Sequence, residues 1–491
     1  MWFNSIDFFW FILIVLPIYY ALGAIRTGRG LPRVLFLLVS SYFFYMYWNP
    51  VYILLIVTST VLDYLCGLGF LKWPKDKHKW LVTFSVCGNL GILGFFKYGR
   101  FFYQNARAIG GSLGFELPPY PEGLDFALPV GISFYTFQTM SYTIDLYRGK
   151  TDVETSFWRF ALFVAYFPQL VAGPIERARH LIGEIKRGVT RAHPVDPMGA
   201  VQQITYGLFK KVAVADSIGI LINPIFANPD EYSGAHILTA CILFSFQIYG
   251  DFSGYSDIAI GIAKLFGIRI STNFFFPYFT TNITSFWRTW HMSLSSWLKE
   301  YLYITLGGNR RGRIRTYANL LTTMLLGGLW HGASWNFVLW GFLHGLYLAA
   351  HRLVRTLRPR AEQTPDSYRV SRAVRFPLIL IAGLFNFFLV ALTWIPFRCA
   401  AFADTVTCLR RIVTCASVSA DAPLVDTGHL TVCWLLVGLV LLFDAFYKCE
   451  FLYWQDKRWP VLVKAPLPAI FVLLTIIFGA SEAQQFIYFQ F

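Results

Sequence analysis

Two histidines of this 491-residue chain stand among tryptophans and small residues, His291 in SFWRTWHMSLSSW and His331 in LLGGLWHGASWNFVLW. A neutral imidazole is the side chain best suited to accept a proton from a hydroxyl group near pH 7. An ionisable side chain in a membrane-embedded stretch is rare and is a candidate for function. We therefore take both histidines as candidate catalytic residues. The competing interpretations are a bond across a helix interface for His331 and an interfacial position for His291.

The residues around the two histidines are suited to line a substrate site. Tryptophans supply rigid apolar walls, and small residues let a helix or a substrate approach closely. Arg288 is the nearest charged residue to His291 in the sequence, and it would lower the pKa of that histidine if the side chains were close. The candidate lining residues here are Trp287, Arg288, Trp290, Trp330, Ser334 and Trp335.

Two other apolar stretches carry polar side chains, SFQIYGDFSGYSDIAIGIAKLFG (245–267) and GISFYTFQTMSYTIDLYRGK (131–150). Their polar residues either line a path for donor or acceptor or form hydrogen bonds between helices, which contribute only about 1 kcal/mol each in membranes. Glycines at 250 and 254 predict a broken helix in the first stretch. The candidate residues are Gln138, Asp251, Tyr255 and Asp257.

The loop GGNRRGRIR (307–315) could bind the phosphates of coenzyme A through Arg310, Arg311 and Arg313. The excess of basic residues in cytoplasmic loops explains the same arginines, and we favour that explanation. The eight cysteines form no CxxC pair and have no zinc-type spacing, so we expect neither a metal site nor a disulfide framework. We also expect no tightly bound cofactor.

The composition predicts an all-α polytopic membrane protein. Hydrophobic residues make up 56% of the chain and charged residues only 14%, against about 25% charged residues in soluble domains. Apolar runs long enough to span a bilayer predict roughly ten to twelve transmembrane helices, with further re-entrant or interfacial helices. They begin near Phe8, Val34, Val51, Trp80, Leu128, Phe157, Ile237, Leu320, Phe376, Leu430 and Pro468.

The net charge of +15 does not indicate nucleic-acid binding. The basic residues cluster in short loops between apolar runs, as the excess of basic residues in cytoplasmic loops of membrane proteins predicts. Arginines follow the first run and lysines the third, whereas the loop after the second run carries no charge. This alternation predicts that the N-terminus faces away from the cytoplasm. The basic residues concerned are Arg26, Arg29, Arg33, Lys72, Lys75, Lys77 and Lys79.

The chain is predicted to be one membrane-embedded domain. We divide it into peripheral N-terminal helices (1–98), a polar loop (99–127), a catalytic core (128–351), a basic cytoplasmic linker (352–375) and C-terminal helices (376–491). In the core, the spacing of apolar residues from 294 to 304 predicts an amphipathic helix capped by Ser293. The stretch FPQLVAGPIERARH (167–180) predicts an irregular element, with Glu176 and Arg177 at the membrane surface.

Read together, several segments resemble the membrane-bound O-acyltransferase family, in particular its bacterial branch that O-acetylates alginate or peptidoglycan. They follow one another from about residue 131 to the C-terminus, and the ordered set is far more specific than any single motif. The segments are GISFYTFQTMSYTIDLYRGK, FPQLVAGPIER, GLFKKVAVAD, DFSGYSDIAIGIAKLFG, NFFFPYFTTNITSFWRTWHMSLSSWLKEYLYI, GGLWHGASWNFVLWG and the terminal FIYFQF.

The resemblance implies a ring of helices around a central tunnel, with two functional histidines that correspond to His291 and His331. It implies an O-acyltransferase that takes an acetyl group from cytoplasmic acetyl-CoA for O-acetylation of a cell-surface or exported polysaccharide. A periplasmic SGNH-type acetyltransferase partner and a location in the bacterial inner membrane are implied as well. D-alanyl transfer and lipid or protein O-acylation remain alternatives within the family, and a secondary transporter or a non-catalytic membrane scaffold are alternatives outside it.

Overall fold

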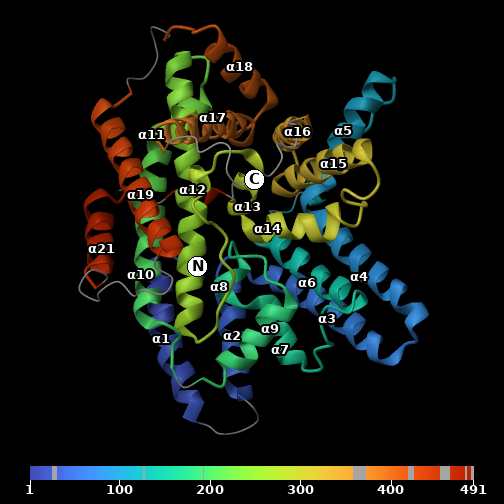
Figure 1. Cartoon of the computed structure of the whole chain (residues 1–491). Coiled ribbons are helices and arrows are strands. Elements are labelled where there is room, and N and C mark those ends of the chain that lie inside the picture. Colours follow the sequence, from blue (N-terminus) through green and yellow to red (C-terminus); the bar gives the residue numbers. More distant parts are fainter. Residues whose placement is uncertain are drawn as a thin grey trace. The chain divides into compact units, whose positions relative to one another are not determined.

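The computed structural model describes residues 1–24, 30–124, 126, 128–191, 193–357, 372–418, 425–453, 465–480 and 484–487. Within these residues every regular element is a helix and no strand occurs (Figure 1). The chain forms two compact units. The first comprises Met1–Gly207 and Tyr255–Ser271, and the second comprises Leu208–Gly254 and Thr272–Phe491. The predicted all-α class is confirmed.

Seven helices in the described part of the chain are long and apolar enough to cross a membrane. Their bounds are Ile6–Ala24, Pro50–Lys72, Lys75–Ser112, Gly234–Leu265, Trp335–Leu357, Phe376–Arg398 and Thr427–Lys448. Two further apolar helices, α2 (Leu31–Met46) and α21 (Leu467–Phe478), are shorter. The number is below the ten to twelve expected, in part because the apolar runs near 128 and 157 form α6 and α7, helices of 16 and 9 residues that are largely buried.

The first unit begins with helices that the apolar runs predicted. Its elements are α1 (Ile6–Ala21), α2, α3 (Ile53–Lys72), α4 (His78–Leu93), α5 (Gly99–Ser112), α6 (Ile132–Tyr147), α7 (Phe157–Ala165), α8 (Phe167–Leu170), α9 (Ala178–Gly188) and α10 (Pro197–Leu208). The predicted loop 99–127 is wrong over its first half, because α5 continues to Ser112. Gly110 and Gly111 lie inside the last turn of this helix, and Gly114 supplies the positive φ just beyond it.

Arg33 does not lie in a charged loop as expected. It belongs to α2 and is only 5% exposed. Its guanidinium donates to the carbonyl oxygens of Tyr19 at 2.9 Å, Val189 at 3.1 Å and Arg191 at 2.6 Å. The carbonyl groups accept the hydrogen bonds that water would accept from an exposed guanidinium, so the buried charge is not left without partners. Arg33 therefore ties α1 and α2 to the chain that follows α9, while Arg26 and Arg29 lie outside the described residues.

The predicted break in the 245–267 stretch is also wrong. α12 runs without interruption from Gly234 to Leu265, through Gly250 and Gly254. A Cβ atom at Gly250 would lie 2.9 Å from the carbonyl oxygen of Lys210. That glycine is required for the close approach of a neighbouring backbone, a frequent reason for glycine in membrane helices, and it does not interrupt the helix.

The second unit contains η7 (Phe209–Ala215), α11 (Asp216–Ala227), the first part of α12, η8 (Pro277–Phe279), α13 (Ile283–Thr289), α14 (Met292–Trp297), η9 (Leu298–Tyr303), α15 (Arg313–His331), α16 (Trp335–Leu357), α17 (Arg372–Arg398), α18 (Phe402–Val413), α19 (Thr427–Tyr453) and α21. The predicted linker 352–375 falls partly in α16 and α17, and its residues 358–371 lie outside the described part. The expected helix at 294–304 is present as α14 and η9, followed by Gly307 and Gly308 with φ of 110° and 54°.

Candidate functional site

His291 lies at the turn between α13 and α14, where the backbone has φ 43° and ψ 55°. Residues other than glycine rarely adopt this left-handed conformation, so surrounding contacts must hold it. Asn273 provides them. Its carbonyl oxygen accepts the Met292 amide at 2.8 Å, and its side-chain oxygen lies 3.0 Å from His291 Nδ1. Both side chains are fully buried. The residue that caps α14 is thus His291, and the expected Ser293 cap is wrong.

The same contacts assign the proton on His291. Asn273 Oδ1 also accepts the backbone amide of Ser293 at 3.3 Å and the Ser293 hydroxyl at 2.9 Å. Because a backbone amide can only donate, this Asn273 atom is the oxygen and not the amide nitrogen. An amide oxygen only accepts, so His291 Nδ1 carries the hydrogen. Nε2 then holds the lone pair, as a general base requires.

The surroundings of His291 favour this neutral form. The ring lies among Phe252 at 4.6 Å, Phe274 at 6.4 Å and Trp330 at 5.9 Å between centroids. Burial lowers the pKa of His291 from 6.5 to about 3. The pKa is therefore lowered in the expected direction, but the cause is desolvation and not a nearby charge, and the side chain of Arg288 is exposed.

Acidification is expected to destabilise the protein through His291. The unfolded chain takes up a proton on this residue near pH 6.5, whereas the folded protein keeps it neutral down to about pH 3. Between these values the unfolded state binds more protons, so the free energy of unfolding falls as the pH decreases. From pH 7 to pH 5 we expect a loss of about 2 kcal/mol. Apparent unfolding temperatures at pH 7, 6 and 5 measure it. His291→Asn should reduce the slope, and an unchanged slope would contradict the assignment.

His331 is the last residue of α15 and is 5% exposed. Its ring makes edge contacts with three aromatic rings: Trp330 at 5.1 Å, Trp340 at 4.9 Å and Phe397 at 5.2 Å between centroids. Trp340 comes from α16 and Phe397 from α17. Three consecutive helices of the second unit therefore enclose this imidazole in apolar surface.

Glycines explain how α15 and α16 come close enough to form this enclosure. A Cβ atom at Gly328 would lie 2.2 Å from the carbonyl oxygen of Phe337, and one at Gly341 would lie 2.3 Å from that of Met324. No real side chain could occupy either position without moving the backbone. Gly328 and Gly341 thus act as small-residue contacts between helices, and they set the position of His331 against Trp340.

The indole of Trp330 connects the two predicted histidines. Its centroid lies 5.9 Å from that of His291 and 5.1 Å from that of His331, and both contacts are edge-on. Trp330 is 3% exposed. The structure thus brings two residues that are 40 positions apart in the sequence into contact with one rigid apolar ring.

The sequence analysis missed a third buried histidine, His344 of α16. Trp287 Nε1 donates to its Nδ1 at 3.2 Å, and its Nε2 lies 3.0 Å from the Thr393 hydroxyl. An indole N–H only donates, so Nδ1 accepts and Nε2 carries the hydrogen that Thr393 accepts. The Thr393 hydroxyl in turn donates to the Val390 carbonyl at 2.6 Å. Both ring nitrogens of His344 therefore have hydrogen-bond partners: Nδ1 holds the Trp287 indole, and Nε2 holds the His344 ring against Thr393. The His–Gly pair within an apolar run, as at His331, could have identified it.

Some of the other predicted lining residues are buried and others are exposed. Trp287 and Trp290 are buried, and Trp290 packs against Trp394 with 5.2 Å between centroids. Trp335, by contrast, is 57% exposed, and Ser334 is half-buried. Trp335 is the first residue of α16.

Asp251 takes part in a buried charge cluster of the second unit. Its carboxylate pairs with Lys211 at 2.8 Å and accepts the Ile487 amide at 2.7 Å. Lys211 also pairs with Asp216 at 2.7 Å and donates to the Gln484 carbonyl at 3.1 Å. These contacts hold residues 484–487 against η7 and α12, which gives Asp251 a structural role.

Three predicted candidates belong to the first unit. Gln138 donates to the Phe163 carbonyl at 2.5 Å and accepts from Gln169 at 3.1 Å. Asp257 accepts from Gln203 at 3.1 Å, and the Tyr255 ring stacks on Phe3 with 4.3 Å between centroids. These contacts are hydrogen bonds between helices for Gln138 and Asp257 and ring packing against the residues before α1 for Tyr255, as the structural alternative drawn from the sequence describes.

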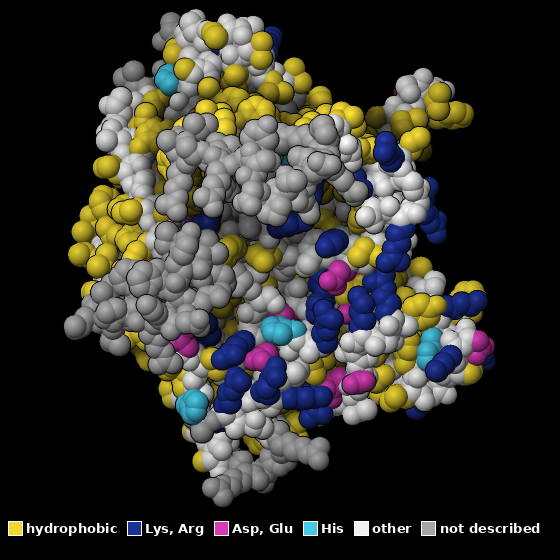
Figure 2. Space-filling view, viewed as in Figure 1, with side chains coloured by type: hydrophobic (Ala, Val, Ile, Leu, Met, Phe, Trp, Pro, Cys, Tyr) yellow, Lys and Arg dark blue, Asp and Glu magenta, His cyan; other side chains and the backbone are white. Residues whose placement is uncertain are grey.

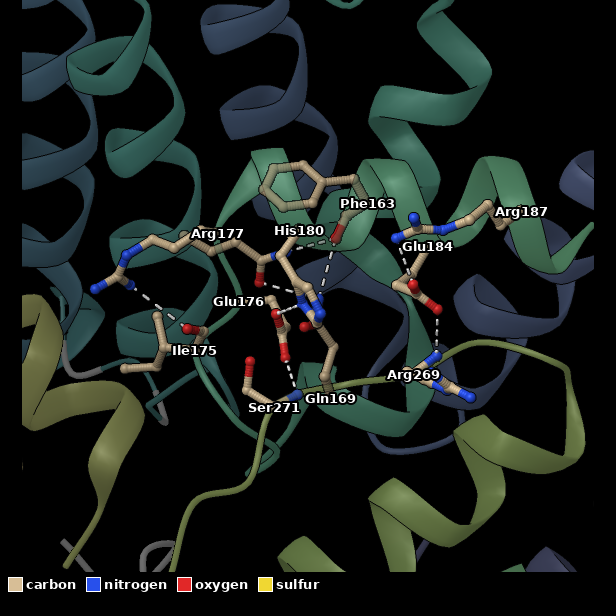
Figure 3. Close-up of polar contacts among 11 residues, drawn as sticks. Phe163, Gln169, Ile175, Glu176, Arg177, His180, Glu184, Arg187, Arg269 and Ser271 are labelled. Atoms are coloured by element: carbon tan, nitrogen blue, oxygen red, sulfur yellow. Dashed lines mark hydrogen bonds and ion pairs between the residues drawn. The ribbon is translucent and has the colours of Figure 1, made fainter. Parts of the chain in front are cut away.

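Glu176, expected at the membrane surface, is enclosed by protein. It is 1% exposed, bonds His180 Nδ1 at 2.7 Å and accepts the Ser271 amide (Figure 3). The chain between α8 and α9 is irregular, as its prolines predicted.

The arginines of the 307–315 loop are exposed. Arg310 and Arg311 precede α15, and Arg313 is its first residue. Their exposure agrees with binding of coenzyme A phosphates and equally with the excess of basic residues in cytoplasmic loops. In the described part of the chain, no group of three or more His, Cys, Asp or Glu side chains could hold a metal ion.

Comparison with known proteins identifies the family. The model of "MBOAT, membrane-bound O-acyltransferase family" matches residues 150–393, which include both site histidines. A probable alginate O-acetylase AlgI of Pseudomonas putida is 34% identical over 98% of this chain and 99% of its own. The chain belongs to the membrane-bound O-acyltransferase family. It is accordingly an O-acyltransferase and a multi-pass membrane protein.

Two further relatives support this membership. A probable alginate O-acetylase AlgI of Azotobacter vinelandii is 40% identical over 79% of this chain and 74% of its own. A peptidoglycan O-acetyltransferase of Helicobacter pylori is 34% identical over 83% of this chain and 80% of its own. The resemblance inferred from the ordered motifs is therefore confirmed.

Proposed function

We propose that this protein transfers an acetyl group from acetyl-CoA to hydroxyl groups of a cell-surface or exported polysaccharide of the alginate or peptidoglycan kind. The family supplies the reaction class, and the names of the relatives support acetyl transfer and this class of acceptor. The observation that carries the site assignment is the contact of two buried imidazoles with one indole, Trp330.

In this proposal His331 acts as the general base. It takes the proton of the acceptor hydroxyl while the hydroxyl oxygen attacks the thioester carbonyl carbon. The tetrahedral intermediate collapses, its C–S bond breaks, and the leaving thiolate takes a proton back from His331. His291 orients the donor, because its Nε2 carries a lone pair and cannot donate a hydrogen bond to the carbonyl oxygen. In a variant of this scheme, His331 itself carries the acetyl group before a partner receives it.

The proposal also assigns sides of the membrane. Acetyl-CoA approaches from the cytoplasm as a substrate, and the N-terminus lies on the opposite side of a bacterial inner membrane. The alternating charge of the first loops supports this orientation. A periplasmic SGNH-type acetyltransferase completes transfer to the polymer.

The test is an assay of the purified protein with acetyl-CoA. We expect release of free CoA thiol that depends on an added polysaccharide or on the partner. In cells, removal of the protein should lower the acetyl-ester content of one surface polymer. D-alanyl, fatty-acyl and acetyl donors compared side by side identify the acyl group. Transport of a solute without thiol release, or no loss of acetyl esters from any polymer, would contradict the proposal.

A further inference from the structure

Helix α9 of the first unit has one buried face and one basic face. Its buried residues include Ala178, Leu181, Ile182 and Ile185, and its exposed residues include Arg179, Lys186 and Arg187. This is the periodicity of an amphipathic helix. Arg191 and Arg269 lie beside it, since Arg191 donates to the Gly267 carbonyl and the Arg269 amide donates to Glu184. We call Arg179, Lys186, Arg187, Arg191 and Arg269 the α9 basic surface. Figure 2 shows Lys and Arg side chains gathered over α9.

Buried carboxylates beneath this surface hold its parts together but do not neutralise it. Glu154 pairs with Lys186 at 2.7 Å, and Glu184 pairs with Arg187 at 2.5 Å. Glu184 also accepts the Arg269 amide at 3.0 Å (Figure 3). The side chains of Arg179 and Arg269 form no ion pair with any residue that the structure describes. Net positive charge therefore remains exposed on one face of α9.

The C-terminal end of α9 lies where apolar spans end. Tyr19, near the end of the Ile6–Ala24 span, donates to the carbonyl oxygens of Gly188 at 3.2 Å and Phe266 at 3.0 Å. Tyr20 donates to the carbonyl of Leu265, the last residue of α12, at 2.6 Å. α9 itself is too short and too charged to cross a bilayer. Because these bonds join the C-terminal end of α9 to the last turns of two apolar spans, we place α9 at the headgroup level.

We propose that the α9 basic surface binds the phosphate groups of anionic phospholipids. Arginine pairs with phosphate through two parallel N–H donors. A membrane surface is favoured over a soluble acidic partner because the bilayer is necessarily next to the span ends that α9 contacts. Basic clusters beside a span are attracted to anionic headgroups. The buried glutamates keep Lys186 and Arg187 in fixed positions, so these residues lose little side-chain freedom on binding.

The experiment titrates the purified full-length protein, in neutral detergent, with phosphatidylglycerol or phosphatidylcholine and measures the rise in unfolding temperature. We expect stabilisation by phosphatidylglycerol that weakens with added salt. The double variant Arg179→Gln/Arg269→Gln should bind the anionic lipid about 25-fold more weakly, about fivefold for each arginine. Arg310→Gln/Arg311→Gln removes the same charge from an exposed loop of the second unit and should leave the affinity unchanged.

Three results would overturn the proposal. The first is that phosphatidylcholine stabilises the protein as well as phosphatidylglycerol does. The second is that the control variant Arg310→Gln/Arg311→Gln loses as much lipid affinity as Arg179→Gln/Arg269→Gln, which we call the α9 pair. The third is that the α9 pair binds the anionic lipid as tightly as the original protein does. Free CoA is titrated in a parallel arm. If the α9 pair loses CoA binding while lipid binding is unchanged, the surface recognises a soluble phosphate ligand and the lipid proposal is wrong. Unfolding temperatures without lipid verify that both variants fold.

Discussion

Replacing His331 by alanine is expected to lower acyl transfer about 10³-fold, the middle of the range for a lost general base. The ring is buried against Trp330, Trp340 and Phe397, where the alanine variant offers no other side chain that could accept the proton. The measurement is the rate of CoA thiol release by protein purified from the membrane, at saturating acetyl-CoA.

Two further variants make the His331 result interpretable. His331→Gln preserves most of the volume within the aromatic enclosure, so it should fold with a near-normal unfolding temperature and remain as inactive as the alanine variant. His193→Ala removes an exposed histidine of the first unit and should leave the rate unchanged. Substantial activity in a folded His331→Gln protein would show that this imidazole moves no proton.

Replacing Asn273 by alanine is expected to lower the rate by about 10- to 100-fold, as for outer residues that fix a functional histidine. Without the Oδ1 acceptor, Nδ1 no longer has to carry the hydrogen, and the left-handed backbone at His291 loses part of its support. His291→Ala should cost about 10²-fold or more. If Asn273 acts through His291, the double variant should be little worse than His291→Ala alone.

Two variants separate the bond to His291 from the other bonds of Asn273. Ser293→Ala removes only the hydroxyl contact to Oδ1 and should retain most of the activity. Asn273→Asp keeps an acceptor for Nδ1–H but adds a negative charge, which should raise the pKa of His291 and make activity decline at a higher pH than in the original protein. Additive losses in the Asn273 and His291 variants would contradict the positioning role.

The sequence predicted the fold class and the two principal histidines because those signals are local. Low charge and long apolar runs require a membrane protein, and His291 and His331 stand out against Trp, Gly and Ser neighbours. What it could not predict were partners distant in the chain. The bond from Trp287 to His344 spans 57 positions, and no local pattern specifies it.

The errors have a common physical origin in residues with two possible uses. Glycine breaks helices but also lets backbones meet, and at Gly250 the second use prevails. Arginine marks cytoplasmic loops but can also be enclosed when carbonyl groups surround it, as for Arg33. Carboxylates usually face water, yet Glu176 is buried because a backbone amide and a histidine share its charge. In each case the tertiary partner decided the outcome.

The left-handed turn at His291 has a consequence for turnover. Because the bonds from Asn273 are made when the chain folds, the free energy that bends the backbone and aligns the imidazole is spent once for each molecule synthesised. An arriving donor then meets an imidazole that is already aligned, and none of its binding energy is diverted to reorganising this part of the protein.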